Sequence, residues 1–133
     1  MEFLNEATYV DQAGEILEAM TRKYIDRNGK EKTPTIVSTS KIRNILSMAA
    51  DIYDNVLQNP SKELNESLAA RVEYLRVRMV YESGREPKVK DFISKTHLLE
   101  YVQMIKGDKQ RYILFYRYLE ALVAFHRYYG GKD

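Results

Sequence analysis

Apolar residues recur at spacings of three and four along most of this chain, a pattern that predicts amphipathic helices. The pattern is most regular after Ser38, Thr39 and Ser40, three candidate N-caps, and it ends at Asn59 and Pro60. The apolar positions of this predicted helix are Ile42, Ile45, Leu46, Ala49, Ile52, Tyr53, Val56 and Leu57.

The N-terminal part of the chain predicts one shorter helix and then an extended arm. The helix covers residues 7–22, with Thr8 as a candidate cap and an acidic outer face. The pair Asn28-Gly29 and then Pro34 indicate a turn and an extended stretch over residues 24–37.

A third helix is predicted to begin at Pro60, because proline suits the first helical position. The pair Ser83-Gly84 is a stop signal, which would take Arg85 out of this helix. Residues 88–107 predict two short helices, or one helix that breaks near Thr96-His97.

The last predicted helix begins at the cap Asp108 and ends at Gly130-Gly131. Its apolar and aromatic residues surround most of the axis, so we expect it to be the most buried helix. Five of its tyrosines are expected at core or boundary positions: Tyr112, Tyr116, Tyr118, Tyr128 and Tyr129.

No run alternates apolar and polar residues for long enough to predict a strand. The predicted fold is all-α, a compact single-domain bundle of about five helices. Residues 1–37 would form the N-terminal helix and arm, and residues 38–133 the helical core.

Two stripes run along the predicted third helix. The apolar stripe predicts a core face and consists of Leu64, Leu68, Val72, Leu75 and Met79. Beside it, residues at alternating spacings of three and four form a basic and aromatic band: Arg71, Tyr74, Arg78, Tyr81 and Arg85.

This band has two interpretations. Each residue alone fits a structural role, in which the tyrosines complete the core edge and the arginine stems cover apolar surface. Taken together, the guanidinium groups present a ladder of hydrogen-bond donors to phosphate on one helix face, with the phenol rings between them to stack or hydrogen-bond. Val77 and Val80 lie off the core face, where another helix of the same domain or a partner protein could cover them.

Composition narrows the possible functions. The chain has no cysteine, so disulfide scaffolds and thiolate chemistry are excluded, and a reducing, cytoplasmic location fits. Its start lacks a signal-peptide pattern and no stretch approaches the roughly 18 apolar residues of a membrane span, so we expect neither secretion nor membrane insertion. Residues 69–133 hold thirteen Lys/Arg against eight Asp/Glu, which favours an anionic partner for that half.

Catalytic signals are few. The six glycines form no phosphate-binding loop, and the two histidines have no metal-ligand spacing, so no cofactor or metal is predicted. A small ribonuclease that uses His97 or His126 stays an alternative, as does a helical protein-interaction adaptor with no direct RNA contact. The helix start around Lys41 and Arg43 combines hydroxyls, free backbone N–H groups and cations, which together suit a bound phosphate.

Three segments in a consistent order resemble one protein family. They are STSKIRNILSMAADIYD, VEYLRVRMVYESGRE followed by VKDFI, and YRYLEALVAFHRYYGGK. Together they resemble the small subunit of type III-A CRISPR interference complexes, the Csm complexes. The similarity spans residues 38–131, whereas residues 1–37 add nothing to it.

The resemblance implies a non-catalytic structural subunit that contacts the backbone of the duplex of guide RNA and target RNA without sequence specificity. Its implied partners are the repeated backbone subunit and the large subunit of the complex, and its copies self-associate along a filament. The implied RNA-binding residues are Lys41, Arg43, Arg78, Arg85 and Arg127. Arg71 is added from its helical spacing alone. Because the bases of a duplex offer no free face, we expect Tyr74 and Tyr81 to hold the arginines and seal the core edge.

Overall fold

The computed structural model describes residues 1–133 as six α-helices and one small β-hairpin. The all-α fold is confirmed, and the sixth helix arises because residues 88–107 form two short helices. The elements in chain order are α1 (Tyr9–Thr21), β1 (Tyr24–Ile25), β2 (Glu31–Lys32), α2 (Thr39–Gln58), α3 (Glu66–Arg85), α4 (Pro87–Thr96), α5 (Leu98–Gln103) and α6 (Lys109–Tyr128).

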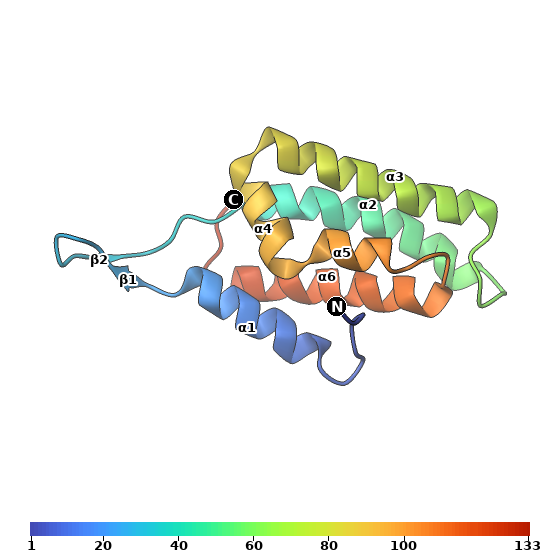
Figure 1. Cartoon of the computed structure of the whole chain (residues 1–133), viewed down its shortest axis with the longest axis horizontal. Helices are drawn as coiled ribbons and strands as arrows, with labels where there is room; N and C mark the ends of the chain where they lie inside the picture. The colour runs from blue at the N-terminus through green and yellow to red at the C-terminus, as the bar shows by residue number, and fades with distance from the viewer.

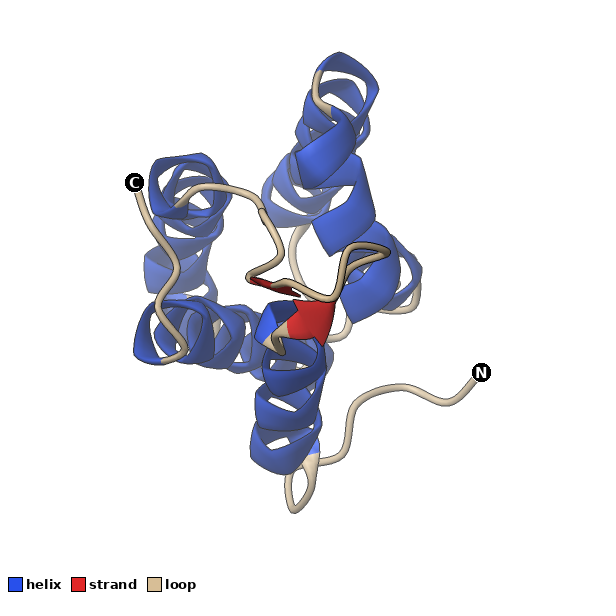
Figure 2. Ribbon diagram, turned by 90° about the vertical axis from the view of Figure 1, so that its left-hand side faces the viewer, coloured by secondary structure: helices blue, strands red, loops and turns tan.

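The helices form a bundle in which α6 lies between α1 and α2, and α2 lies beside α3 (Figure 1). The short helices α4 and α5 pack on α3. The hairpin of β1 and β2 projects from one end of the bundle, the end at which α2 begins and the chain terminates (Figure 1). Seen from that end, the hairpin stands in front of the helices (Figure 2).

The core is one cluster of 28 buried apolar residues, and α6 runs through it as predicted. Tyr112 and Tyr118 are fully buried, and their hydroxyls donate hydrogen bonds to the carbonyls of Ala49 (2.6 Å) and Thr96 (2.8 Å). Burial of both rings therefore leaves no unsatisfied hydroxyl. Tyr128 and Tyr129 end α6 and are exposed, so the prediction of core or boundary positions is wrong for these two residues.

Helix α3 differs from the prediction at both ends. It begins at Glu66 and not at Pro60, because Asn65 caps it by accepting a hydrogen bond from the backbone N–H of Leu68 (2.9 Å). It also runs through Ser83-Gly84, so Arg85 stays in the helix. The helix ends where the residue before Pro87 adopts extended backbone angles, as proline requires of its predecessor.

Two other helix boundaries lie at their predicted positions. The break near Thr96-His97 is confirmed, and His97 adopts the left-handed conformation there with φ of 60°. Thr8 occupies the N-cap position of α1 but makes no side-chain capping bond.

The arm contains strands that the sequence pattern did not predict. Tyr24 pairs with Lys32 and Ile25 pairs with Glu31, and two residues per strand are too few for alternation to be visible in the sequence. None of the helices combines the length and the apolar content that crossing a membrane requires.

Candidate nucleic-acid interface

Two of the predicted RNA-binding residues face one groove between α2 and α3. Lys41 comes from the first turn of α2, where Ser38 accepts a hydrogen bond from its backbone N–H (3.4 Å). Arg78 lies about two helical turns before the end of α3. The groove encloses about 300 Å³, and its other lining residues are Asn44, Ile45, Met48, Leu75, Met79, Glu82 and Val89.

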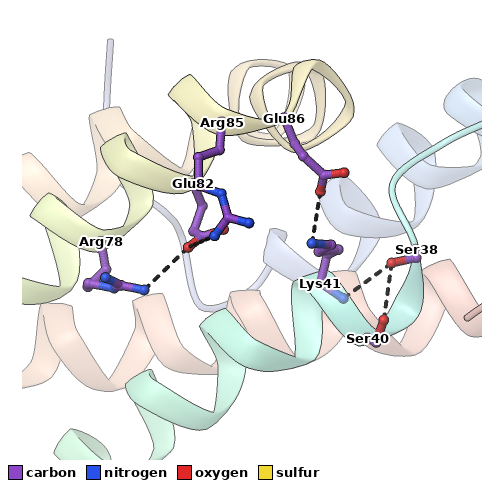
Figure 3. Close-up of polar contacts among 7 residues, drawn as sticks. All are labelled: Ser38, Ser40, Lys41, Arg78, Glu82, Arg85 and Glu86. Carbon is purple, nitrogen blue, oxygen red and sulfur yellow. Dashed lines mark hydrogen bonds and ion pairs between the residues drawn. The ribbon is translucent and has the colours of Figure 1, made fainter.

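Arg78 and Arg85 are held by the same two neighbours on α3. Nη2 of Arg78 lies 3.3 Å from Oε1 of Glu82, and Nη1 of Arg85 lies 3.7 Å from the same oxygen (Figure 3). The ring of Tyr81 contacts both guanidinium groups, with its centroid 5.2 Å from Arg78 Cζ and 5.7 Å from Arg85 Cζ. The one-turn spacing of the band therefore gathers both arginines around one carboxylate and one aromatic ring.

The tyrosines of this band do not seal the core edge as predicted. Tyr81 is 52% exposed and Tyr74 is 60% exposed, because both point away from the buried stripe of Val72, Leu75 and Met79. Tyr81 holds the two arginines, which agrees with the other half of the expectation.

Lys41 is paired across the helices. Its Nζ lies 3.3 Å from Oε2 of Glu86, the residue that links α3 to α4 (Figure 3). The side chains of Lys41 and Glu86 are 37% and 41% exposed. Ion pairs this accessible to water contribute about 0–1 kcal/mol each, so a phosphate can replace the carboxylate at little cost.

A second depression continues the groove along the same two helices. Arg71 and Tyr74 from α3 and Asp51 from α2 line about 170 Å³, and the two depressions share Met48 and Leu75. Arg71 is half-buried and forms no ion pair. Arg71, which helical spacing alone suggested, thus lines the continuation of the groove that Lys41 and Arg78 line.

The remaining three predicted residues, Arg43, Arg85 and Arg127, line neither depression. Arg43 is exposed on α2 and forms no ion pair. Arg127 lies in the last turn of α6, and its Nη1 donates a hydrogen bond to the carbonyl of Gly131 (3.3 Å). The structure therefore brings Lys41, Arg71 and Arg78 to one groove along α2 and α3. Arg85 is joined to this groove only through its ion pair with Glu82.

Sequence reasoning missed the carboxylates that accompany these cations. Glu82 lies four residues after Arg78 and three before Arg85, a helical spacing that indicates ion pairs in the sequence itself. Glu86 could not be matched to Lys41 from sequence, because the two residues meet only through the tertiary arrangement of α2 and α4.

The histidines form no catalytic pair. His126 is fully buried, and its Nε2 lies 2.7 Å from the carbonyl oxygen of Val37, which requires the ring to donate a hydrogen bond. His97 is exposed, with Nδ1 2.7 Å from Oε2 of Glu100. No group of three or more His, Cys, Asp or Glu residues is arranged to hold a metal ion. His126 is thus a structural residue, with no access to a substrate.

Comparison with known proteins finds one family. A family model described as Csm2 Type III-A matches residues 18–132. A protein of Streptococcus thermophilus, named CRISPR system Cms protein Csm2, is 38% identical over 133 residues and is covered over 100% of both chains. Relatives with the same name are 38% identical over 94% of both chains in Mycobacterium tuberculosis, and 37% identical over 73% of this chain and 71% of the relative in Enterococcus italicus.

Proposed function

Because the chain belongs to the Csm2 family of type III-A CRISPR systems, we propose that it is a non-catalytic, RNA-binding structural subunit of the interference complex. In this role it contacts the sugar-phosphate backbone of the guide–target duplex without reading its sequence. The observation that carries the proposal is the groove between α2 and α3, which Lys41 and Arg78 line from opposite helices.

The chemistry of the groove suits a backbone ligand. A target whose sequence changes with every guide must be held through its phosphates and its A-form shape, since base pairing already reads the sequence. Guanidinium groups suit this task because they donate paired hydrogen bonds to phosphate oxygens. Glu82 and Glu86 keep the cations in place until a phosphate replaces them.

The modest charge of the chain agrees with several copies acting on one RNA. The formal net charge is only +2, and two carboxylates accompany Lys41, Arg78 and Arg85 in the interface. Such a surface binds RNA weakly as a monomer, whereas copies arranged along one strand bind with combined strength. The proposed partners are therefore the guide and target RNA, further copies of this chain, and the repeated backbone subunit and large subunit of the complex.

A second candidate function is protein interaction without RNA contact, and the outer face of α3 favours it. Val77 and Val80 are 58% and 52% exposed, so no other helix of this chain covers them. Large exposed apolar residues next to each other on a helix commonly mark a protein contact. The adaptor function predicts that neutralising the groove cations leaves RNA binding unchanged.

The test replaces Arg78, which lines the groove, and Arg85, which shares Glu82 with it, by neutral residues. The double variant Arg78→Gln, Arg85→Gln removes two guanidinium groups that could donate hydrogen bonds to phosphate, and it places no new negative charge beside Glu82. We expect target RNA to bind the assembled complex about tenfold or more weakly, and the slope of log K against log salt to fall by about two. The midpoint of thermal unfolding should change little, because ion pairs at this helical spacing contribute about 0.3–0.5 kcal/mol each.

A matched control removes the same charge elsewhere. Arg76 and Lys95 each form an ion pair along a helix, with Glu73 and Asp91, and neither residue belongs to the groove. The variant Arg76→Gln, Lys95→Gln should therefore bind RNA like the wild type. Equal losses in the two double variants would point to net charge alone and would count against a defined interface.

A further inference from the structure

The projecting hairpin is rich in positive charge, although the net charge of the whole N-terminal region is close to zero. Residues 1–21 hold five Asp/Glu and no Lys/Arg, whereas residues 22–37 hold five Lys/Arg and two Asp/Glu. The change of sign coincides with the end of α1 at Thr21, where the chain leaves the bundle (Figure 1). The charge excess is therefore confined to the arm and its hairpin.

Both carboxylates of the hairpin are already engaged within it. Oδ1 of Asp26 accepts hydrogen bonds from the backbone N–H groups of Asn28 (2.9 Å) and Lys30 (3.0 Å), which closes the turn. Glu31 lies 3.4 Å from Nζ of Lys23. The side chains of Arg27, Lys30 and Lys32 form no ion pair, so their charges are available to a partner.

Strand register separates the two faces of the hairpin. Tyr24 lies opposite Lys32 and Ile25 lies opposite Glu31, and successive side chains of a strand point to opposite faces. Tyr24 and Lys32 therefore share one face, whereas Lys23 and Glu31 pair on the other. Tyr24 is 52% exposed, so its ring stands beside a free cation on a surface open to solvent.

We propose that the Tyr24–Lys32 face of the hairpin binds unpaired RNA, with the tyrosine ring stacking on a base and the lysines contacting phosphates. Aromatic rings between cations bind single strands because every unpaired base offers a flat face, whatever its identity. A guide–target duplex offers no such face, so this ligand differs from the paired RNA proposed for the groove. This site shares no residue with the groove, because it consists only of residues of the hairpin.

The geometry favours RNA over a protein strand that extends the sheet. Each strand of the hairpin has only two paired residues, which leaves too short an edge for main-chain addition of a partner strand. The free charges are all positive, which matches a phosphate backbone.

The experiment measures binding of the full-length chain to a fluorescein-labelled oligouridylate of about 12 nucleotides, which is within the range of single-strand sites. The tested variant is Tyr24→Ala, and Tyr24→Phe is its matched control because it keeps the ring. Stacking worth about 1–3 kcal/mol predicts that Tyr24→Ala binds about fivefold to 150-fold more weakly. Tyr24→Phe should bind within about twofold of the wild type. The double variant Lys30→Gln, Lys32→Gln should bind the oligouridylate more weakly and with a smaller salt dependence than the wild type.

Other ligands and variants separate this inference from the function proposed for the groove. Binding of a labelled RNA duplex should be unaffected by Tyr24→Ala, and binding of the single strand should be unaffected by Arg78→Gln, Arg85→Gln. The inference is overturned if the wild type does not bind the oligouridylate at millimolar protein, or if Tyr24→Ala binds it like the wild type. It is equally overturned if Tyr24→Ala loses only its association with purified Csm subunits, which would make the hairpin a protein contact.

Discussion

Replacing His126 by alanine should destabilise the protein strongly, although this residue was a candidate catalytic group in the sequence. The ring is fully buried, and its Nε2 donates to the carbonyl of Val37 at 2.7 Å. Loss of a large buried side chain leaves a cavity, and loss of the donor leaves a buried carbonyl unpaired at a cost of about 1–3 kcal/mol. Together we expect His126→Ala to lower the free energy of unfolding by about 3–5 kcal/mol.

The loss should spread to the end of the molecule that carries Lys41 of the proposed RNA interface. His126 joins the end of α6 to the segment just before α2, and Thr39 at the start of α2 donates its backbone N–H to the carbonyl of Lys132 (2.8 Å). These bonds fix the first turn of α2, from which Lys41 extends. Amide exchange near residues 37–41 should therefore accelerate in His126→Ala more than exchange elsewhere.

Urea unfolding followed by circular dichroism measures the effect directly. The variant His126→Gln keeps an amide donor near the Nε2 position and should recover part of the loss. His97→Asn is the exposed control and should lie within about 0.5 kcal/mol of the wild type, since asparagine tolerates the left-handed backbone at that position. A stable His126→Ala protein with wild-type unfolding would refute the structural role assigned to this ring.

Two further predictions concern stability. A Cβ at Gly131 would overlap the His126 ring, so Gly131→Ala should lower the free energy of unfolding by about 1–3 kcal/mol. Gly84 lies in open space on a helix, so Gly84→Ala should raise the free energy of unfolding by about 0.5–1 kcal/mol. The same urea titration measures both variants. Burial raises the pKa of Tyr112 and Tyr118 far above the ordinary 10.0, so the stability that their protonated hydroxyls provide is complete below pH 10 and is lost at higher pH. Thermal unfolding measured above about pH 10 should show this loss, and an absorbance titration should show two tyrosines that ionise only as the chain unfolds.

Hydrophobic patterns that continue over several helical turns were enough to predict the helical fold and most of its core. The three-four spacing of apolar residues in α2 marks the one face that is buried, whereas α6 has apolar residues around most of its axis and is buried on several sides. The resemblance to the small subunit of type III-A complexes is confirmed, and the family match extends further toward the N-terminus than the segments that suggested it, since it begins at residue 18 within α1.

Local signals predicted boundaries less well because several candidates competed. Pro60 and Asn65 both suit a helix start, and buried Asn59 decides between them by accepting a hydrogen bond from the Asn65 backbone N–H (3.2 Å). Ser83 and Gly84 suit a helix stop, yet Ser83 donates to the carbonyl of Met79 (2.8 Å) and the helix continues. In both places tertiary or backbone contacts outweighed the preference of a single residue.

The candidate interface was predictable along one helix but not across helices. The spacing of Arg71, Arg78 and Arg85 placed them on one side of α3, and that arrangement is what the structure has. The position of Lys41 across the groove and its pairing with Glu86 depend on how α2 and α4 dock against α3. Arg127, which the family resemblance suggested, lies instead at the end of α6 beside the C-terminal glycines.

Site-specific photocrosslinking in the assembled complex tests the central claim most directly. A benzophenone side chain at Asn44, an exposed residue that lines the groove, reports what lies against it, and Gln110 on α6 serves as the control position. If the groove holds the guide–target duplex, irradiation should link Asn44 to guide or target RNA irrespective of sequence and should leave Gln110 without an RNA adduct. Adducts from Asn44 to protein subunits alone would contradict the account and establish the adaptor function in its place.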